Sequence, residues 1–148
     1  HQVILTNMME VLLPWFKGKK CKVFAAPFDV TLENVEKESK NVVQPDILIS
    51  CDYYEKRNEK DRYTGIPALV MEILSPQTRS RDHTRKLNVY MIGGISEYWI
   101  VDPRDMKVVQ YYFENKEMKE MITYNAPEVV RSMYFEGLEV STAYIFQE

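Results

Sequence analysis

The first sixteen positions of the chain repeat apolar residues with the period of a helix. The spacings of four, three and one predict an amphipathic helix, and the residues that carry them are Ile4, Met8, Val11, Leu12 and Trp15. Pro14 is expected to kink or end this helix and Gly18 to stop it.

After this helix the pattern changes to short apolar runs separated by turn residues, which is typical of strands. The runs cover 21–25, 28–32, 47–50, 68–74, 98–101, 107–113, 118–124, 129–133 and 138–140. A second helix is expected over 82–92, capped by Ser80 or Asp82 and stopped by Gly93 and Gly94. Residues 33–41 form a loop or hairpin, and the strongly polar 52–65 form a solvated surface loop. This order predicts an α/β mixed-sheet architecture with β-hairpins at its C-terminal end.

Length and composition fit one ordinary domain, residues 1–148. The chain has 148 residues, of which 45% are hydrophobic and 28% charged. Its apolar runs are far shorter than the roughly 20 residues that cross a membrane. Cys21 and Cys51 each lie in or beside a strand-like run, where cysteine usually packs as a small hydrophobe. We therefore expect no disulfide framework and a reducing, cytoplasmic setting.

The charge of the chain is unevenly distributed. Its net charge is -3, whereas nucleic-acid-coating proteins are normally basic. Residues 77–94 nevertheless carry +3, from Arg79, Arg81, Arg85 and Lys86 against Asp82. The three arginines either hold phosphates near a site or are a solvated helix entry. An acidic body with one basic segment concentrates its attraction for anions at one place.

Two carboxylates interrupt apolar strand runs. Glu72 lies within the run 68–74 and Asp46 opens the run 47–50. Burying a carboxylate is unfavourable unless it is paired or coordinated, and carboxylate oxygens are the ligands that Mg²⁺ prefers. Lys86, fourteen residues after Glu72, could add positive charge for a transition state. The alternatives are a Glu72 that faces solvent, an Asp46 in a turn, and a Lys86 that pairs with Asp82 on the helix surface.

Three motifs resemble the Uma-type restriction endonuclease family. They are VVQPDILI at 42–49, LVMEILSP at 69–76 and EYWIVDP at 97–103, with Arg81, Asp82, Lys86, Tyr90 and Gly94 between the last two. The resemblance runs from His1 to about Leu138 in the order of the family. Family members ordinarily have further residues before the position of His1, so we expect a chain shortened at its N-terminus.

The resemblance implies a restriction-endonuclease-like mixed β-sheet flanked by helices, with a C-terminal antiparallel β meander and a PD-(D/E)xK-type site. Asp46 and Glu72 match its two acidic positions and are the expected ligands of Mg²⁺ or Mn²⁺. The usual lysine would stand at position 74, which here is Leu74. By resemblance, Lys86 on the following helix supplies the lysine. Asp29 is either a third carboxylate or a structural acid, and Tyr90 either an auxiliary residue or part of the core.

The function expected from these residues is metal-dependent cleavage of nucleic-acid phosphodiester bonds, with DNA as the substrate. A catalytically idle module that binds nucleic acid or a protein is the alternative. We treat His1 and His83 as non-catalytic. A homodimer is expected, and a possible surface for it is rich in aromatic residues, namely Tyr111, Tyr112, Phe113, Tyr124, Tyr134 and Phe135.

Overall fold

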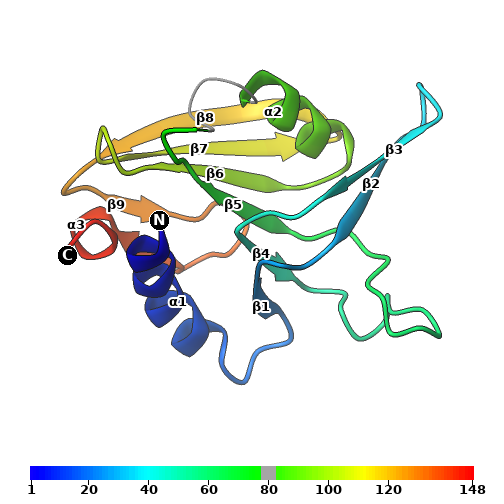
Figure 1. Ribbon diagram of the computed structural model, residues 1–148, viewed down its shortest axis with the longest axis horizontal. Helices are drawn as coiled ribbons and strands as arrows, with labels where there is room; N and C mark the ends of the chain where they lie inside the picture. The colour runs from blue at the N-terminus through cyan, green and yellow to red at the C-terminus, as the bar shows by residue number, and fades with distance from the viewer. Residues whose placement is uncertain (78–82) are drawn as a thin grey trace.

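The computed structural model describes residues 1–77 and 83–148, with His83 described by its backbone alone. A six-stranded sheet in the order β1-β4-β5-β6-β7-β8 forms its centre (Figure 1). The strands are β1 (Lys22–Ala25), β4 (Ile47–Ser50), β5 (Leu69–Ile73), β6 (Glu97–Asp102), β7 (Lys107–Glu114) and β8 (Glu117–Asn125). Neighbours pair antiparallel except β5 and β6, which are parallel. The sheet is therefore mixed, as the sequence predicted.

Helix α1 (Gln2–Phe16) covers one face of this sheet, while α2 lies on the opposite side (Figure 1). Its buried residues Ile4, Met8, Leu12 and Phe16 pack in one apolar cluster with strand residues such as Met71 and Trp99. Pro14 lies inside the last turn, so it does not end the helix early. The amphipathic pattern thus predicted both the helix and its buried face.

Helix α2 (His83–Ile92) connects the parallel strands β5 and β6 and covers the second face. The cluster beneath it includes Leu48, Val70 and Tyr98. Successive side chains of a strand point to opposite faces. Met71 belongs to the α1 face and Val70 to the α2 face, so Glu72 projects toward α2. This alternation decides which helix can reach the carboxylate.

Two small sheets flank the central one. Strands β2 (Val30–Asn34) and β3 (Ser39–Val43) form a hairpin, which decides between the loop and hairpin alternatives for 33–41. Strands β9 (Val129–Arg131) and β10 (Glu139–Ser141) pair with each other outside the central sheet. The meander is therefore β6, β7 and β8. A short helix, α3 (Thr142–Ile145), was not predicted, because four residues are too few to show a helical period.

The α3 segment is fixed to α1 by a buried amide. The side chain of Asn7 donates hydrogen bonds to the carbonyl oxygens of Ile145, at 3.1 Å, and Gln147, at 3.0 Å. Tyr144 adds a hydrogen bond from its hydroxyl to Glu10 on the same helix, at 2.8 Å. These contacts join the two ends of the described chain, since α1 opens it and α3 lies near its end.

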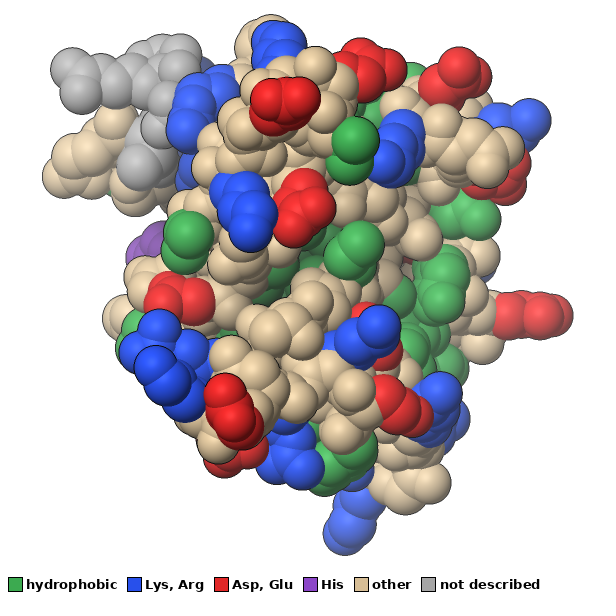
Figure 2. Space-filling view, turned by 90° about the vertical axis from the view of Figure 1, so that its right-hand side faces the viewer, with side chains coloured by type: hydrophobic (Ala, Val, Ile, Leu, Met, Phe, Trp, Pro, Cys, Tyr) green, Lys and Arg blue, Asp and Glu red, His purple; other side chains and the backbone are tan. Residues whose placement is uncertain are grey.

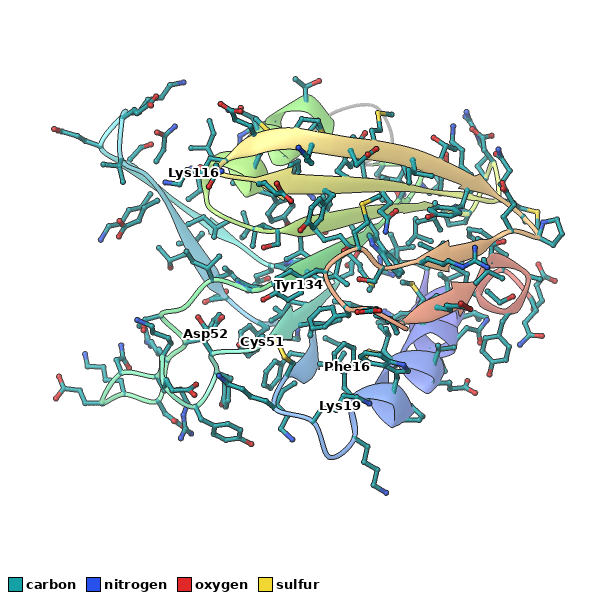
Figure 3. The ribbon with its side chains drawn as sticks, turned by 180° about the vertical axis from the view of Figure 1, so that it is seen from behind. Phe16, Lys19, Cys51, Asp52, Lys116 and Tyr134 are labelled. Atoms are coloured by element: carbon teal, nitrogen blue, oxygen red, sulfur yellow. A yellow bond between two sulfur atoms is a disulfide. The ribbon has the colours of Figure 1, made fainter. Side chains whose placement is uncertain are left out.

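Cys21 and Cys51 form a disulfide, so the expectation of two separate, reduced cysteines is wrong (Figure 3). The physical reason is the register of β1 and β4, in which Lys22 lies opposite Ser50. The next pair along this antiparallel ladder is Cys21 and Cys51, whose Cα atoms are 4.1 Å apart. A separation of 30 residues in the sequence gave no sign of this pairing.

Reduction of this disulfide is expected to lower the free energy of unfolding. A cross-link between residues 30 positions apart removes chain entropy from the unfolded state worth about 2–4 kcal/mol. Urea denaturation with and without dithiothreitol measures the difference. The Cys21→Ser/Cys51→Ser double variant serves as the control, because dithiothreitol should not change its midpoint. Free thiols detected by mass spectrometry after alkylation without reductant would contradict the pairing.

Candidate active site

Strand pairing brings Asp46 and Glu72 to the same end of the β4–β5 ladder. The two strands run antiparallel, and Ile47 lies opposite Met71. Continuing that register by one residue sets Asp46, just before β4, opposite Glu72 on β5. The two candidate ligands are thus neighbours because of a register that the sequence alone did not fix.

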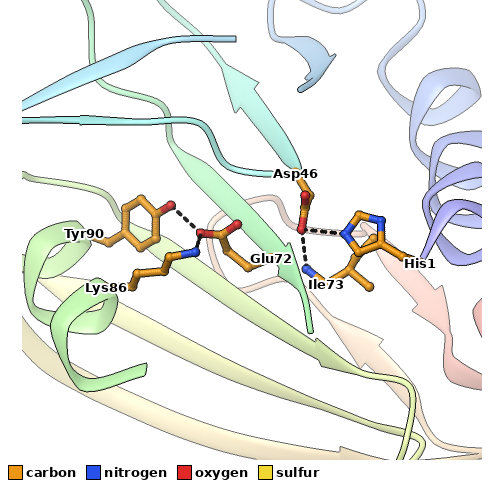
Figure 4. Close-up of polar contacts among 6 residues, drawn as sticks. All are labelled: His1, Asp46, Glu72, Ile73, Lys86 and Tyr90. Carbon is orange, nitrogen blue, oxygen red and sulfur yellow. Dashed lines mark hydrogen bonds and ion pairs between the residues drawn. The ribbon is translucent and has the colours of Figure 1, made fainter. Parts of the chain in front are cut away.

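Asp46 accepts a hydrogen bond from the backbone of its neighbouring strand. Its Oδ2 atom lies 2.7 Å from the backbone nitrogen of Ile73 and 3.4 Å from Nε2 of His1 (Figure 4). Burial raises the pKa of the Asp46 carboxyl, and the Ile73 N–H and the charge of Lys86 partly offset that rise. The carboxylate is therefore held in place on one side and desolvated, which is the usual condition of a functional acid.

Glu72 is buried, with 7% of its surface exposed, and its charge is satisfied by two side chains of α2. Its Oε2 atom lies 2.9 Å from Nζ of Lys86 and accepts a hydrogen bond of 2.9 Å from the hydroxyl of Tyr90 (Figure 4). Burial raises the pKa of Glu72, while Lys86 and Tyr90 oppose the rise and Asp46 adds to it. The possibility that Glu72 faces solvent is thereby excluded.

Helix α2 delivers Lys86 to the face where a motif lysine at position 74 would stand. Leu74 follows Glu72 by two residues, so strand alternation points both to the α2 side, and Leu74 packs against the cluster on that side. Tyr90 follows Lys86 by one helical turn, so both side chains lie on one helix face. The ammonium group thus reaches Glu72 from the helix instead of from the strand.

Tyr90 is both part of the core and a neighbour of the candidate site, the two roles that the sequence left open. The residue is 1% exposed and packs in the cluster under α2, and its ring lies 4.7 Å from that of Tyr98. Its hydroxyl also holds Glu72 at 2.9 Å. Burial and the neighbouring Glu72 raise the pKa of Tyr90, so its hydroxyl stays protonated and acts as a donor.

The remaining sequence candidates have different surroundings. Asp29 is exposed and accepts a hydrogen bond of 2.6 Å from the side chain of Gln44, which supports a structural role. Arg85 is exposed on α2. Arg79 and Arg81, and the expected caps Ser80 and Asp82, lie outside the described residues. Their proposed contact with phosphates stays a prediction.

His1 is the contact that sequence analysis missed. It was expected to be non-catalytic, yet its imidazole lies 3.4 Å from Asp46. No helical or strand period could have indicated this, because 45 positions separate the two residues and only the packing of α1 brings them together. A histidine beside a candidate metal ligand is the sort of neighbour that orients or extends such a site.

The donor set fits a hard divalent cation with few protein ligands. Asp46 and Glu72 offer carboxylate oxygens, and Mg²⁺ is commonly held by one or two carboxylates together with water and substrate phosphates. Within the described ranges, no three His, Cys, Asp or Glu side chains gather as a metal-binding group. Asp46 and Glu72 are thus the two protein ligands that these residues would offer to such a cation.

Comparisons with known proteins bear on the family and the fold of the chain. Residues 1–143 match the sequence profile of the Uma2 family, described as "Putative restriction endonuclease". An uncharacterized protein from Synechocystis, slr1290, is 22% identical over 113 residues, which are 76% of this chain and 56% of that protein. The chain thus matches little more than half the length of this relative.

A solved structure has the same fold. It is the crystal structure of a "putative nuclease belonging to DUF820" from Anabaena variabilis, with a TM-score of 0.78 and 21% sequence identity. The superposition covers 99% of this chain and 79% of the other. The expected restriction-endonuclease-like architecture, a mixed sheet flanked by helices, is confirmed at the level of the fold.

Proposed function

Because the chain belongs to the Uma2 family of restriction-endonuclease-like proteins, we propose that it is a metal-dependent endonuclease with DNA as its substrate. The observation that carries the proposal is the environment of Glu72. This buried carboxylate is paired with Lys86 at 2.9 Å and lies where the strand register brings Asp46 opposite. The groups that phosphodiester hydrolysis needs are thus available here: two acids at one end of the β4–β5 ladder, and a lysine that reaches Glu72 from α2.

In this proposal Asp46 and Glu72 would hold Mg²⁺ or Mn²⁺, which would supply Lewis acidity toward the scissile phosphate and offset charge on the leaving oxygen. Lys86 places an ammonium group beside the phosphate, where it orients the attacking water and stabilises the added negative charge. Tyr90 positions Glu72 through its hydrogen bond. The Ile73 N–H positions Asp46 in the same way.

The proposal is tested by the metal dependence of cleavage. The purified chain is incubated with plasmid DNA or RNA in Mg²⁺, Mn²⁺ or EDTA, and nicked or shortened products are measured on gels. We expect products with either metal and none with EDTA, because two carboxylates and a lysine alone offer no Lewis acid. Cleavage that continues in EDTA would contradict the proposal, as would absence of cleavage with every metal.

A second test separates Lys86 from metal binding. In Lys86→Met we expect the cleavage rate to fall about 100-fold, the usual contribution of one positioned charged or proton-transfer group. Calorimetric binding of Mn²⁺ should persist, because Asp46 and Glu72 remain. Lys86→Arg keeps the charge and should retain more activity than Lys86→Met. Equal cleavage by wild type and Lys86→Met would remove the lysine from the proposed site.

A catalytically idle nucleic-acid or protein-binding module remains the second candidate. It is favoured by Leu74 at the motif lysine position and by the net charge of -3. On the face drawn in Figure 2, acidic and basic side chains are interspersed, with hydrophobic ones between them. Binding to that face would therefore depend on local contacts and not on one broad basic surface. Nucleic-acid binding in EDTA without cleavage in any metal would support this candidate.

A homodimer is a further proposal. A cytoplasmic setting is proposed as well, but the disulfide between Cys21 and Cys51 removes the support that reduced cysteines were expected to give it. The aromatic residues considered as one dimer surface are divided between the two sides of the sheet: Phe113 belongs to the α2 cluster, whereas Phe135 and Tyr124 belong to the α1 cluster. The six residues therefore do not form one common face, and their part in a dimer stays a prediction. Sedimentation of the purified chain tests the dimer. Among the described residues, no helix has the length and apolarity to span a membrane.

A further inference from the structure

A cavity of about 460 Å³ opens beside the candidate active site. Its walls come from three separate parts of the chain: the start of α1, the residues that follow β5, and the β6–β7 turn. The lining residues are His1, Leu74, Ser75, Pro76, Pro103 and Arg104. This volume lies within the range of small-molecule sites, which is about 300–1,000 Å³. One nucleotide unit is a ligand of suitable size.

The cavity lies next to Asp46, one of the two candidate metal ligands. His1 lines it and also lies 3.4 Å from Oδ2 of Asp46. Leu74 lines it two residues after Glu72, and the intervening Ile73 donates to Asp46 at 2.7 Å. A phosphate bound at Asp46 has this cavity as a neighbour. The cavity is therefore a place where the next unit of the same strand can lie.

The walls combine apolar surface with one cation. Leu74, Pro76 and Pro103 present hydrocarbon, which suits the face of a base or a sugar. The Arg104 side chain is 70% exposed, and its Nε lies 3.4 Å from Asp105. Such exposed ion pairs contribute little free energy, so the guanidinium can exchange this partner for a phosphate. Arginine is well suited to that contact because its planar group can donate two hydrogen bonds.

We propose that this cavity receives the nucleotide adjoining the scissile phosphate, with Arg104 binding the next phosphate along the strand. The inference rests on the proposed nuclease function, because it assigns a place to the substrate of that site. It accounts for two features that the catalytic residues leave unexplained: an apolar hollow beside charged groups, and an exposed arginine at its rim. Contacts to phosphates hold a strand without reading its sequence.

The test measures binding of a fluorescently labelled single-stranded DNA oligonucleotide in EDTA, where no metal-dependent cleavage can occur, and again in Ca²⁺. Arg104→Met should weaken binding about fivefold or more, and reduce the slope of log affinity against log salt by about 0.7, the value for one phosphate contact on a single strand. Arg131→Met is the matched control. Arg131 is similarly exposed, at 67%, and likewise lies 3.4 Å from an acid, Glu139. The Arg131→Met variant should leave both the affinity and the salt slope unchanged.

A second variant tests the hollow itself. Leu74→Trp fills the cavity from its wall and should weaken binding of the oligonucleotide, with thermal denaturation verifying that the variant is folded. Unchanged binding by Arg104→Met would overturn the inference, as would a wild-type chain that binds no oligonucleotide in either condition. If poly-glutamate displaces the labelled DNA as effectively as unlabelled DNA does, the cavity is assigned to an acidic peptide instead.

These experiments distinguish failure of the cavity assignment from failure of the proposed nuclease function. If the chain cleaves DNA but Arg104→Met and Leu74→Trp bind as wild type does, the nuclease function stands and the cavity assignment fails. If binding depends on Arg104 but no metal supports cleavage, the cavity binds nucleic acid on an idle scaffold, and the nuclease proposal fails.

Discussion

Glu72→Gln is expected to reduce metal-dependent cleavage about 1,000-fold, which corresponds to about 4 kcal/mol of transition-state stabilisation. The amide keeps the shape of the side chain and can still accept hydrogen bonds from Tyr90 and Lys86. It removes the negative charge, so it weakens the metal site and leaves Lys86 without its counter-charge at 2.9 Å. Initial rates of plasmid nicking in Mg²⁺ and Mn²⁺ measure the effect, with Mn²⁺ binding followed by calorimetry.

Stability measurements on the same variant separate loss of chemistry from loss of fold. Because burial raises the pKa of Glu72, the folded state favours the protonated carboxyl. The stability of the metal-free wild type relative to Glu72→Gln should therefore be highest below the ordinary glutamate pKa of about 4.3. It should fall as the pH rises through the pKa that Glu72 has in the folded state. Glu139→Gln, at an exposed acid, should cleave at the wild-type rate. Equal rates for wild type and Glu72→Gln would exclude Glu72 from the mechanism.

Glu97→Ala is expected to lower the free energy of unfolding by roughly 3–5 kcal/mol, the largest effect on stability that we expect. Glu97 is completely buried on β6 and lies outside the candidate active site. Its Oε1 accepts hydrogen bonds from the hydroxyl of Ser132 at 3.0 Å and from the backbone nitrogens of Met133 at 3.0 Å and Tyr134 at 2.8 Å. Its Oε2 accepts from the side chains of Gln110 and Trp99. Alanine would leave all five donors without this acceptor, and the bonds from Gln110 and Trp99 are buried while the other three are partly buried.

Urea denaturation monitored by tryptophan fluorescence measures the change, provided the slope of free energy against urea stays constant. Glu97→Gln should fall between wild type and Glu97→Ala, because one oxygen remains while the new amide group meets other donors. Glu139→Gln serves again as the exposed control and should change stability by less than about 0.5 kcal/mol. A loss below about 1 kcal/mol for Glu97→Ala would show that solvent or rearranged partners replace the carboxylate.

The sequence predicted most of the secondary structure, because each element has a local signature. Strand β4 was predicted at its observed bounds, and the turn expected near Asn115 and Lys116 joins β7 to β8. The parts that were missed had no such signature. The α3 helix has four residues. The pairing of β9 with β10 outside the main sheet depends on contacts between distant segments.

In the candidate site, too, some features were predicted from local signals in the sequence and others were not. The position of Glu72 within an apolar run indicated a carboxylate that needs partners, and the family resemblance indicated Lys86. Neither indicated that Tyr90 donates to the same oxygen as Lys86, or that Asp46 is held by the backbone of Ile73. Those contacts follow from the packing of α2 on β5 and from the β4–β5 register. Sequence periodicity predicts which face of a helix or strand is buried, but not which other element packs against that face.

Asp46, Glu72 and Lys86 thus came from the sequence, since their signals are local: charge within apolar runs, and motifs read in order. His1 beside Asp46 and the bond between Cys21 and Cys51 came from the tertiary structure. Both join residues at least 30 positions apart, and such contacts form only when helices pack and strands choose a register. The sequence by itself determined which groups are available for chemistry. The tertiary structure decided which of them meet.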